Sequence, residues 1–255
     1  MTRTVRLATG DGRSADIPNS SPVARYPDGT WLMSALGGVS VELPSPFRGD
    51  STALVRTDPD GRVLDLVLVR GPDPNVSFRP GDGSVFAMPF ALRTHTGVDT
   101  RGRRVAVARP EVGPGAVVTV HLEVRDPEGE GVFSRSVEVP GVPLPRTAVD
   151  SVLDLMRDRG AAPQGLEAAV LESSPDVYPP LENLVVGMDG SIWIGIRQPD
   201  PDDRRYLVFA SDGALQGWVG LPQRSRVMEA TIDRVWAVEL DEVDVPSVVT
   251  YSVGW

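Results

Sequence analysis

The 255-residue sequence contains no cysteine and no lysine, and only two of its residues are histidines. Without cysteine the chain cannot form disulfides, use a thiolate nucleophile or hold zinc through sulfur. All 25 basic residues are arginines, and 35 acidic residues give a net charge of −10. An acidic chain without a basic block lacks the electrostatic footprint of a protein that binds a phosphate backbone, so nucleic acid is disfavoured as a partner.

Long apolar segments are also missing. No window approaches the roughly 18 apolar residues of a membrane span, and the first residues, MTRTVRLATGDGR, hold no apolar core of signal-peptide length. As read, the chain is expected to be cytoplasmic. It would be periplasmic or secreted if a leader and further sequence precede Met1, so the compartment stays open.

Residues that interrupt regular structure are frequent, with 26 glycines and 24 prolines. Proline breaks the helical hydrogen-bond ladder and glycine weakens it, so a helical bundle is excluded. With 41% hydrophobic and 24% charged residues the composition is that of a globular protein. At this length an all-β chain is expected to form a single domain, residues 1–255.

A recurring turn with flanking strands is the strongest internal pattern. Asp-Gly supplies the positive φ angles of a tight hairpin, and an aromatic residue two or three positions later is expected to pack on a neighbouring sheet. One set of copies covers residues 27–33, 81–88, 188–196 and 232–240, with a weaker copy at 100–108. A second set, in which a strand ends at an acidic-Gly turn and another returns, covers residues 4–17, 53–69, 121–139 and 206–221.

The two sets alternate along the chain, and two hairpins make a four-stranded antiparallel sheet. That strand count and the spacing of about 40–50 residues are those of a β-propeller blade. A β-sandwich is the alternative, but it does not require two hairpin types in this order. The sequence predicts about four blades, at residues 20–74, 92–142, 181–222 and 226–255, and an N-terminal hairpin at 3–18 that completes the last one.

One segment departs from this pattern. Residues 146–174 are expected to form a helix–turn–helix insert, in which Thr147 and Asp150 fit a capping box and Gly160 ends the first helix. We interpret the insert as an amphipathic lid on the propeller, with a docking surface for a partner protein as the alternative.

With the blades placed, the chain resembles a group of bacterial six-bladed β-propeller proteins distantly related to NHL- and TolB-like propellers. The residues that carry the likeness are DVYPPLENLVVGMDGSIWIGI at 176–196, YLVFASDGALQGWVGLP at 206–222 and RVMEATIDRVWAVELDEVDVPSVVTYSV at 226–253. These motifs are structural and transfer no catalytic residue. The group has six blades and commonly carries an export or lipoprotein signal, so the resemblance implies an N-terminally truncated chain whose first blades are missing. A closed four-bladed ring, completed by the N-terminal hairpin, is the alternative.

Few residues are candidates for chemistry. His121 lies in an alternating run and is expected to be a strand residue, whereas His95 begins a probable inner strand. The acidic clusters, which are Asp200, Asp202, Asp203 and Glu239, Asp241, Glu242, Asp244, lack the glycine and distal glutamate of an EF-hand and are interpreted as solvated hairpin tips. The sequence therefore predicts no cofactor, with a divalent metal such as calcium as the alternative.

Position alone predicts that a set of polar residues faces the central channel and binds a ligand: Arg25, His95, Glu182, Asn183 and Glu229. Alternation along a strand is expected to turn either Glu182 or Asn183 away from a shared site. The predicted function is a ligand- or protein-binding scaffold without enzymatic activity and with an unknown small molecule or protein as partner. The alternative is a metal-dependent hydrolase or lactonase that acts in the channel.

Overall fold

The computed structural model describes residues 5–8, 14–17, 20–36, 52–70, 73, 77–78, 86–158, 165–200, 204–222 and 224–255. The predicted turns at 9–13 and 81–85, and Asp202 and Asp203, lie outside these residues. Among the described residues, no helix has both the length and the apolar character that crossing a membrane requires.

Most strands belong to sheets in which consecutive strands pair antiparallel with their chain neighbours. The first sheet contains β3 (Ser20–Arg25), β4 (Trp31–Leu36), β5 (Thr52–Thr57) and β6 (Val63–Arg70). The second contains β9 (His95–Val98), β10 (Val105–Val112), β11 (Val117–Arg125) and β12 (Gly131–Pro140). The third contains β13 (Leu181–Val186), β14 (Ile192–Ile196), β15 (Arg204–Phe209) and β16 (Leu215–Leu221).

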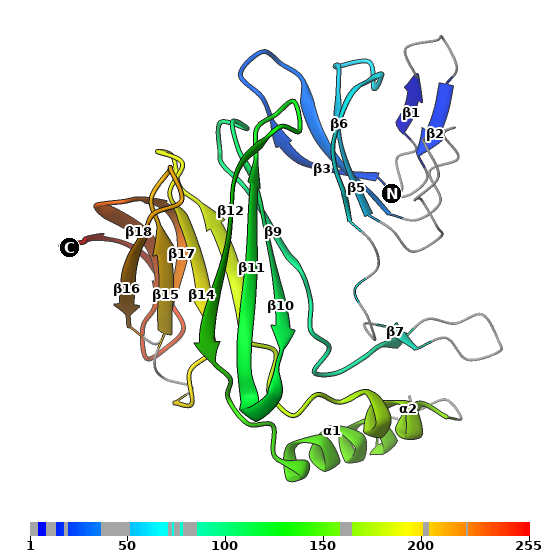
Figure 1. The fold of residues 1–255 in the computed structure, drawn as a ribbon, viewed down its shortest axis with the longest axis vertical. Coiled ribbons are helices and arrows are strands. Elements are labelled where there is room, and N and C mark those ends of the chain that lie inside the picture. Colours follow the sequence, from blue (N-terminus) through cyan, green and yellow to red (C-terminus); the bar gives the residue numbers. More distant parts are fainter. Residues whose placement is uncertain are drawn as a thin grey trace.

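A fourth sheet has three strands, β17 (Ser225–Thr231), β18 (Arg234–Leu240) and β19 (Pro246–Ser252). The four sheets follow one another through the molecule in chain order (Figure 1). The first strand of the third sheet, β13, packs against β9 of the second and β17 of the fourth, as inner strands do in a propeller. The chain is therefore an all-β protein with antiparallel propeller blades and a short helical insert.

Two short hairpins lie outside these sheets. They are β1 (Val5–Ala8) with β2 (Ser14–Ile17), and β7 (Ser77–Phe78) with β8 (Phe86–Ala87). In the described part of the chain β1 and β2 pair only with each other, so the predicted joining of this hairpin to the C-terminal sheet is not formed there. The blade boundaries and the six-bladed ring stay predictions.

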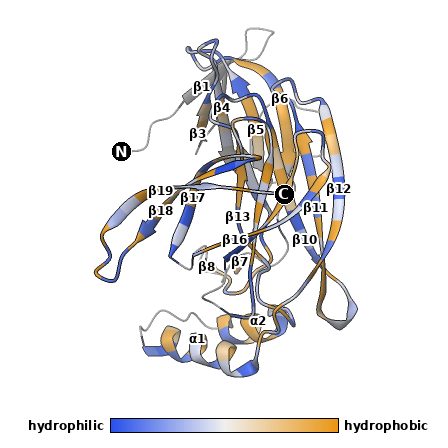
Figure 2. Cartoon of the chain, turned by 90° about the vertical axis from the view of Figure 1, so that its left-hand side faces the viewer, coloured by the Kyte–Doolittle hydropathy of each residue, from blue (hydrophilic) through white to orange (hydrophobic). Residues whose placement is uncertain are grey.

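The helices α1 (Arg146–Asp158) and α2 (Leu166–Ser173) lie in the predicted insert, at one end of the sheets (Figure 2). Val149, Leu153 and Val170 are buried in a cluster that also contains Met88 and Ala91. The predicted capping box is wrong. Because α1 already includes Arg146, Thr147 lies inside the first turn, and the first turn closes instead through the amide of Ala148, which donates to the carbonyl of Pro145.

The buried cores lie between sheets. One cluster joins Leu122 of the second sheet to Ile194 and Leu207 of the third, and another joins Trp193 of the third to Val235 of the fourth. Strand alternation explains this, since the two faces of a sheet in the middle of the row each meet a neighbour. In the described part of the chain, each of these two clusters therefore belongs to a pair of neighbouring sheets.

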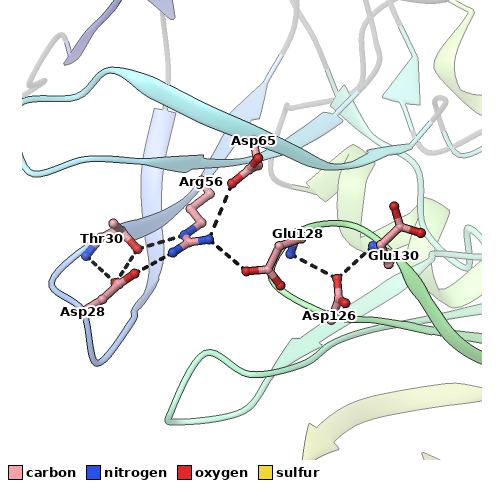
Figure 3. A network of polar contacts seen from close by, with 7 residues as sticks. All are labelled: Asp28, Thr30, Arg56, Asp65, Asp126, Glu128 and Glu130. Carbon is pink, nitrogen blue, oxygen red and sulfur yellow. Dashed lines mark hydrogen bonds and ion pairs between the residues drawn. The ribbon is translucent and has the colours of Figure 1, made fainter. Parts of the chain in front are cut away.

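Polar contacts from the hairpin turns bridge the same junctions. Within the first sheet, the guanidinium of Arg56 donates to Asp28 at 2.5 Å and to Thr30 Oγ1 at 3.1 Å. It also donates to Glu128, in the β11–β12 turn of the second sheet, at 3.1 Å (Figure 3). Between the third and fourth sheets, the amide of Ile232 donates to Asp189 Oδ2 at 2.7 Å. The Asp-Gly turns therefore both reverse the chain and connect neighbouring blades.

Candidate functional site

A cavity of about 760 Å³ lies between the third and fourth sheets, at the strand ends opposite the Asp-Gly turns. The starts of β13, β15 and β17 meet the end of β18 here because the sheets are antiparallel meanders. The lining residues are Glu182, Asn183, Arg204, Arg224, Ser225, Arg226, Val238 and Leu240. Three arginines and one glutamate give this lining an excess of positive charge, in a chain whose net charge is −10.

The arginines of the cavity differ in how their charge is balanced. Arg204 forms an ion pair with Glu182 at 3.1 Å, and Arg197 approaches the same carboxylate at 3.9 Å. Arg224 pairs with Asp244 and donates to the carbonyl of Asp241. The guanidinium of Arg226 forms no hydrogen bond or ion pair with any residue in the described part of the chain. The guanidinium of Arg226 is thus available to an anionic ligand.

One wall of the cavity is held in place by a carboxylate. Glu239 accepts hydrogen bonds from the hydroxyl of Ser225, at 2.8 Å, and from that of Tyr251. Burial raises the pKa of Tyr251, and the neighbouring Glu239 carboxylate raises it further. These contacts tie the start of β17 to β18 and β19, and so fix the backbone that carries Arg224 and Arg226.

Glu182 and Asn183 both line the cavity, although alternation predicts that they point apart. The reason is a register shift between Leu181 and Asn183 at the start of β13, which breaks the alternation. The side chain of Asn183 lies over Gly195 of β14 and donates from Nδ2 to Tyr206 Oη at 3.1 Å. A Cβ at Gly195 would collide with Asn183 Oδ1, so the glycine makes room for this amide. We therefore regard Asn183 mainly as a residue that shapes the wall.

The other three predicted site residues lie elsewhere. Arg25 is the last residue of β3, where its guanidinium stands 5.6 Å from the ring centroid of Trp31. His95 is the half-buried first residue of β9. Glu229 accepts a hydrogen bond from the amide of its neighbour Ala230. None of the three lines the cavity that Glu182 and Asn183 share, so the five residues do not form one site in the described part of the chain.

The acidic cluster near the C-terminus is used for local structure. Asp241 accepts from the amides of Val243 and Val245 in the β18–β19 turn, and Asp244 pairs with Arg224. Across the described residues, no group of three or more histidine, aspartate or glutamate side chains is arranged to hold a metal ion. Nothing in this part of the structure therefore adds support to the predicted metal-dependent alternative.

Sequence reasoning missed the three arginines of the cavity. The available signal is the basic pair that opens β15, Arg204 and Arg205, together with Arg224 and Arg226, which flank the first residue of β17. Every basic residue of this chain is an arginine, so residue type alone does not single out the three in the cavity. They come together only because the starts of strands in two neighbouring sheets lie side by side in the fold.

No protein-family model matches the chain, and no curated protein matches it. Among solved structures, the chain is similar to the β-propeller domain of the trilobed protease from Pyrococcus furiosus, with 8% identity and a TM-score of 0.37, over 89% of this chain and 51% of that one. A GH43 β-1,3-galactosidase matches with 14% identity and a TM-score of 0.34, over 94% and 72%. Prolyl oligopeptidase B from Galerina marginata matches with 8% identity and a TM-score of 0.33, over 97% and 33%.

The chain thus spans about half of the first of these structures and a third of the last. The likeness is too distant to carry an argument about function. Membership of the six-bladed group, and its bacterial origin, stay predictions.

Proposed function

We propose that this chain is a ligand-binding β-propeller and that its cavity between the third and fourth sheets holds a small molecule with a carboxylate or phosphate group. The observation that carries the proposal is the unpaired guanidinium of Arg226 in a cavity with two further arginines. An arginine presents several N–H donors in a planar fork that matches both kinds of anion.

The partners of Arg204 and Arg224 sharpen this proposal. Both already interact with carboxylates, Glu182 and Asp244, at the margin of the cavity. Each ion pair holds its guanidinium group in place beside the cavity. The net charge of the lining favours an anion, while Val238 and Leu240 offer an apolar surface to the rest of the molecule.

Isothermal titration calorimetry of the full chain with inorganic phosphate and with citrate tests the proposal. We expect saturable binding of at least one anion and, for Arg226→Gln, an affinity about tenfold lower, which corresponds to about 1.4 kcal/mol. The exposed Arg101 lies in the β9–β10 turn, outside the cavity, so Arg101→Gln is the matched control.

Titrations at constant ionic strength distinguish anion binding from a general effect of salt on charge screening. A titration with glucose tests whether the cavity instead binds an uncharged sugar. Equal affinities of the wild-type and Arg226→Gln proteins would contradict the proposal. So would the absence of saturable heat with both anions.

A further inference from the structure

Three polar side chains form a hydrogen-bonded row across the second sheet, far from the arginine cavity. Glu111 Oε2 lies 3.0 Å from His121 Nε2, and His121 Nδ1 lies 2.9 Å from Ser136 Oγ. The residues come from three consecutive strands, β10, β11 and β12. In the register His121 stands opposite Ser136 on one side and Arg109 on the other, so the row lies on one face of the sheet.

The order of the three groups fixes the protonation of the neutral imidazole. A carboxylate can only accept, so the contact with Glu111 requires a proton on Nε2. Nδ1 then has a free lone pair and accepts the hydroxyl proton of Ser136. A carboxylate, an imidazole and a hydroxyl in this spatial order can activate a serine as a nucleophile. The imidazole takes the hydroxyl proton as the serine oxygen attacks the substrate.

A cavity of about 240 Å³ lies between the first and second sheets, and of the three groups in the row His121 is the one that lines it. His121, Arg109, Glu123 and Ser134 line it from the second sheet, and Leu68 and Val69 line it from β6 of the first. The guanidinium of Arg109 makes no hydrogen bond or ion pair with the rest of the described chain. The cavity therefore offers an apolar wall, a base and an unpaired cation that can stabilise a developing oxyanion.

We propose that Ser136, His121 and Glu111 form a nucleophilic site that hydrolyses small carboxylic esters, with Arg109 as the oxyanion donor. Ser136 Oγ attacks the acyl carbon while its proton moves to His121 Nδ1. The tetrahedral intermediate expels the alcohol, which takes that proton. Water then attacks the acyl-serine, gives a proton to Nδ1, and the carboxylic acid leaves as the proton returns to Ser136.

Glu111 acts through the imidazole and is a positioning residue. Its side chain is 74% exposed, against 34% for His121, so it orients the ring from the solvent side. This inference is independent of the anion cavity, since the two sites share no residue. The test of covalent chemistry at Ser136 is therefore independent of the test of anion binding.

Labelling with a fluorophosphonate probe, located by tandem mass spectrometry, is the direct test. The serine oxygen displaces fluoride and forms a phosphonate ester. We expect labelling of Ser136 in the folded protein and its loss on heat denaturation and in His121→Ala. Ser134 is the matched control, because it lines the cavity two residues earlier on β12 and has no contact with His121.

Hydrolysis of p-nitrophenyl acetate by the same variants provides the second measurement. We expect Ser136→Ala to lose about 100-fold in kcat. Ser247→Ala, at an exposed position of β19 that lines neither cavity, is expected to keep the wild-type rate. Glu111→Gln is expected to lower kcat with KM unchanged, whereas Glu111→Asp restores part of the rate. Circular dichroism of each variant verifies the fold.

Equal labelling of Ser134 and Ser136 would overturn the proposal, as would wild-type hydrolysis by Ser136→Ala. Labelling that persists after denaturation would do the same, because it would show a reaction that does not depend on the folded site.

Discussion

At the scale of single residues, the aspartates of the turns have a second role. Asp28 Oδ1 accepts from the amide and the hydroxyl of Thr30, at 2.9 and 2.7 Å, while Oδ2 accepts from Arg56. Asp189 repeats the pattern with Ser191 and with the amide of Ile232. Burial opposes the charge of Asp189, but these hydrogen bonds lower its pKa overall. Each carboxylate thus closes its own turn and contacts another element of the fold.

The pH dependence of stability follows from Asp28. Hydrogen bonds from the Thr30 hydroxyl and amide, together with Arg56, lower the pKa of Asp28 from 3.8 to about 2. A carboxyl whose pKa is lower in the folded state stabilises the fold fully above its unfolded pKa and loses that contribution as pH falls. We expect the free energy of unfolding to fall between about pH 4 and pH 2, and to fall less steeply in Asp28→Asn.

Urea unfolding at a series of acidic pH values measures this slope. Asp60→Asn is the control, because Asp60 occupies an exposed turn and no ion pair of the described residues involves it. A slope that Asp28→Asn and Asp60→Asn change equally would contradict a specific role for the Asp28 carboxylate.

Residue-level prediction from sequence succeeded where local chemistry decides and failed where tertiary contacts do. Asp-Gly predicts a tight turn, and Gly29 and Gly190 indeed have positive φ angles of 88° and 84°. That Arg56, 28 residues after Asp28, would bind the turn carboxylate is not encoded in any local pattern. The shared cavity position of Glu182 and Asn183 depends on an irregularity in β13, which periodicity alone cannot predict.

At the scale of elements, the β11–β12 turn packs closely on the first sheet. Gly129 has a φ of +88°, and a Cβ there would lie 3.0 Å from the carbonyl oxygen of Leu66 and 3.1 Å from that of Val67. Gly29 has the same φ but would meet no atom within 4 Å. Substitution of either glycine by alanine therefore has the same backbone cost. The two positions differ because an added Cβ would press on a neighbouring strand only at Gly129.

Substitution of these glycines by alanine measures that contact. A positive φ costs an L-residue roughly 1–2 kcal/mol, which both variants should lose. Gly129→Ala should lose about 1–3 kcal/mol more, because β6 must move or the turn must tilt. Midpoints of urea unfolding give the comparison. Equal losses would show that the turn approaches β6 without packing on it.

The helices show how far an amphipathic pattern can be used. The apolar spacing in 146–174 correctly indicates helices, because it depends on near neighbours. The buried face of α1 contains Val149 and Leu153, and its partner, around Met88 and Ala91, comes from a distant segment that the pattern does not indicate. The first residue of α1 differs from the prediction because Pro145, and not Thr147, precedes the helix.

At the scale of the whole molecule, the cores between sheets determine how the protein unfolds. Leu32 is fully buried at the junction of the first and second sheets, and Leu122 at that of the second and third. Repeat proteins in which each unit depends on its neighbours lose cooperativity only when an interface is weak. Here the ion pair between Arg56 and Glu128 adds a polar contact to the first junction, so we expect all described sheets to unfold in one transition.

Two variants at different junctions test this expectation. Leu32→Ala and Leu122→Ala should each destabilise the protein by about 2–5 kcal/mol, and each should move a single urea transition without changing its slope. Leu215→Ala is the control, since that side chain is 51% exposed. Far-ultraviolet circular dichroism and tryptophan fluorescence should report the same midpoint, because Trp31 lies in the first sheet and Trp193 and Trp236 lie in the third and fourth. If Leu32→Ala instead splits the transition while Leu122→Ala moves only its second phase, the first sheet unfolds separately. The inter-sheet cores would then bind neighbours together without making the row of blades one cooperative unit.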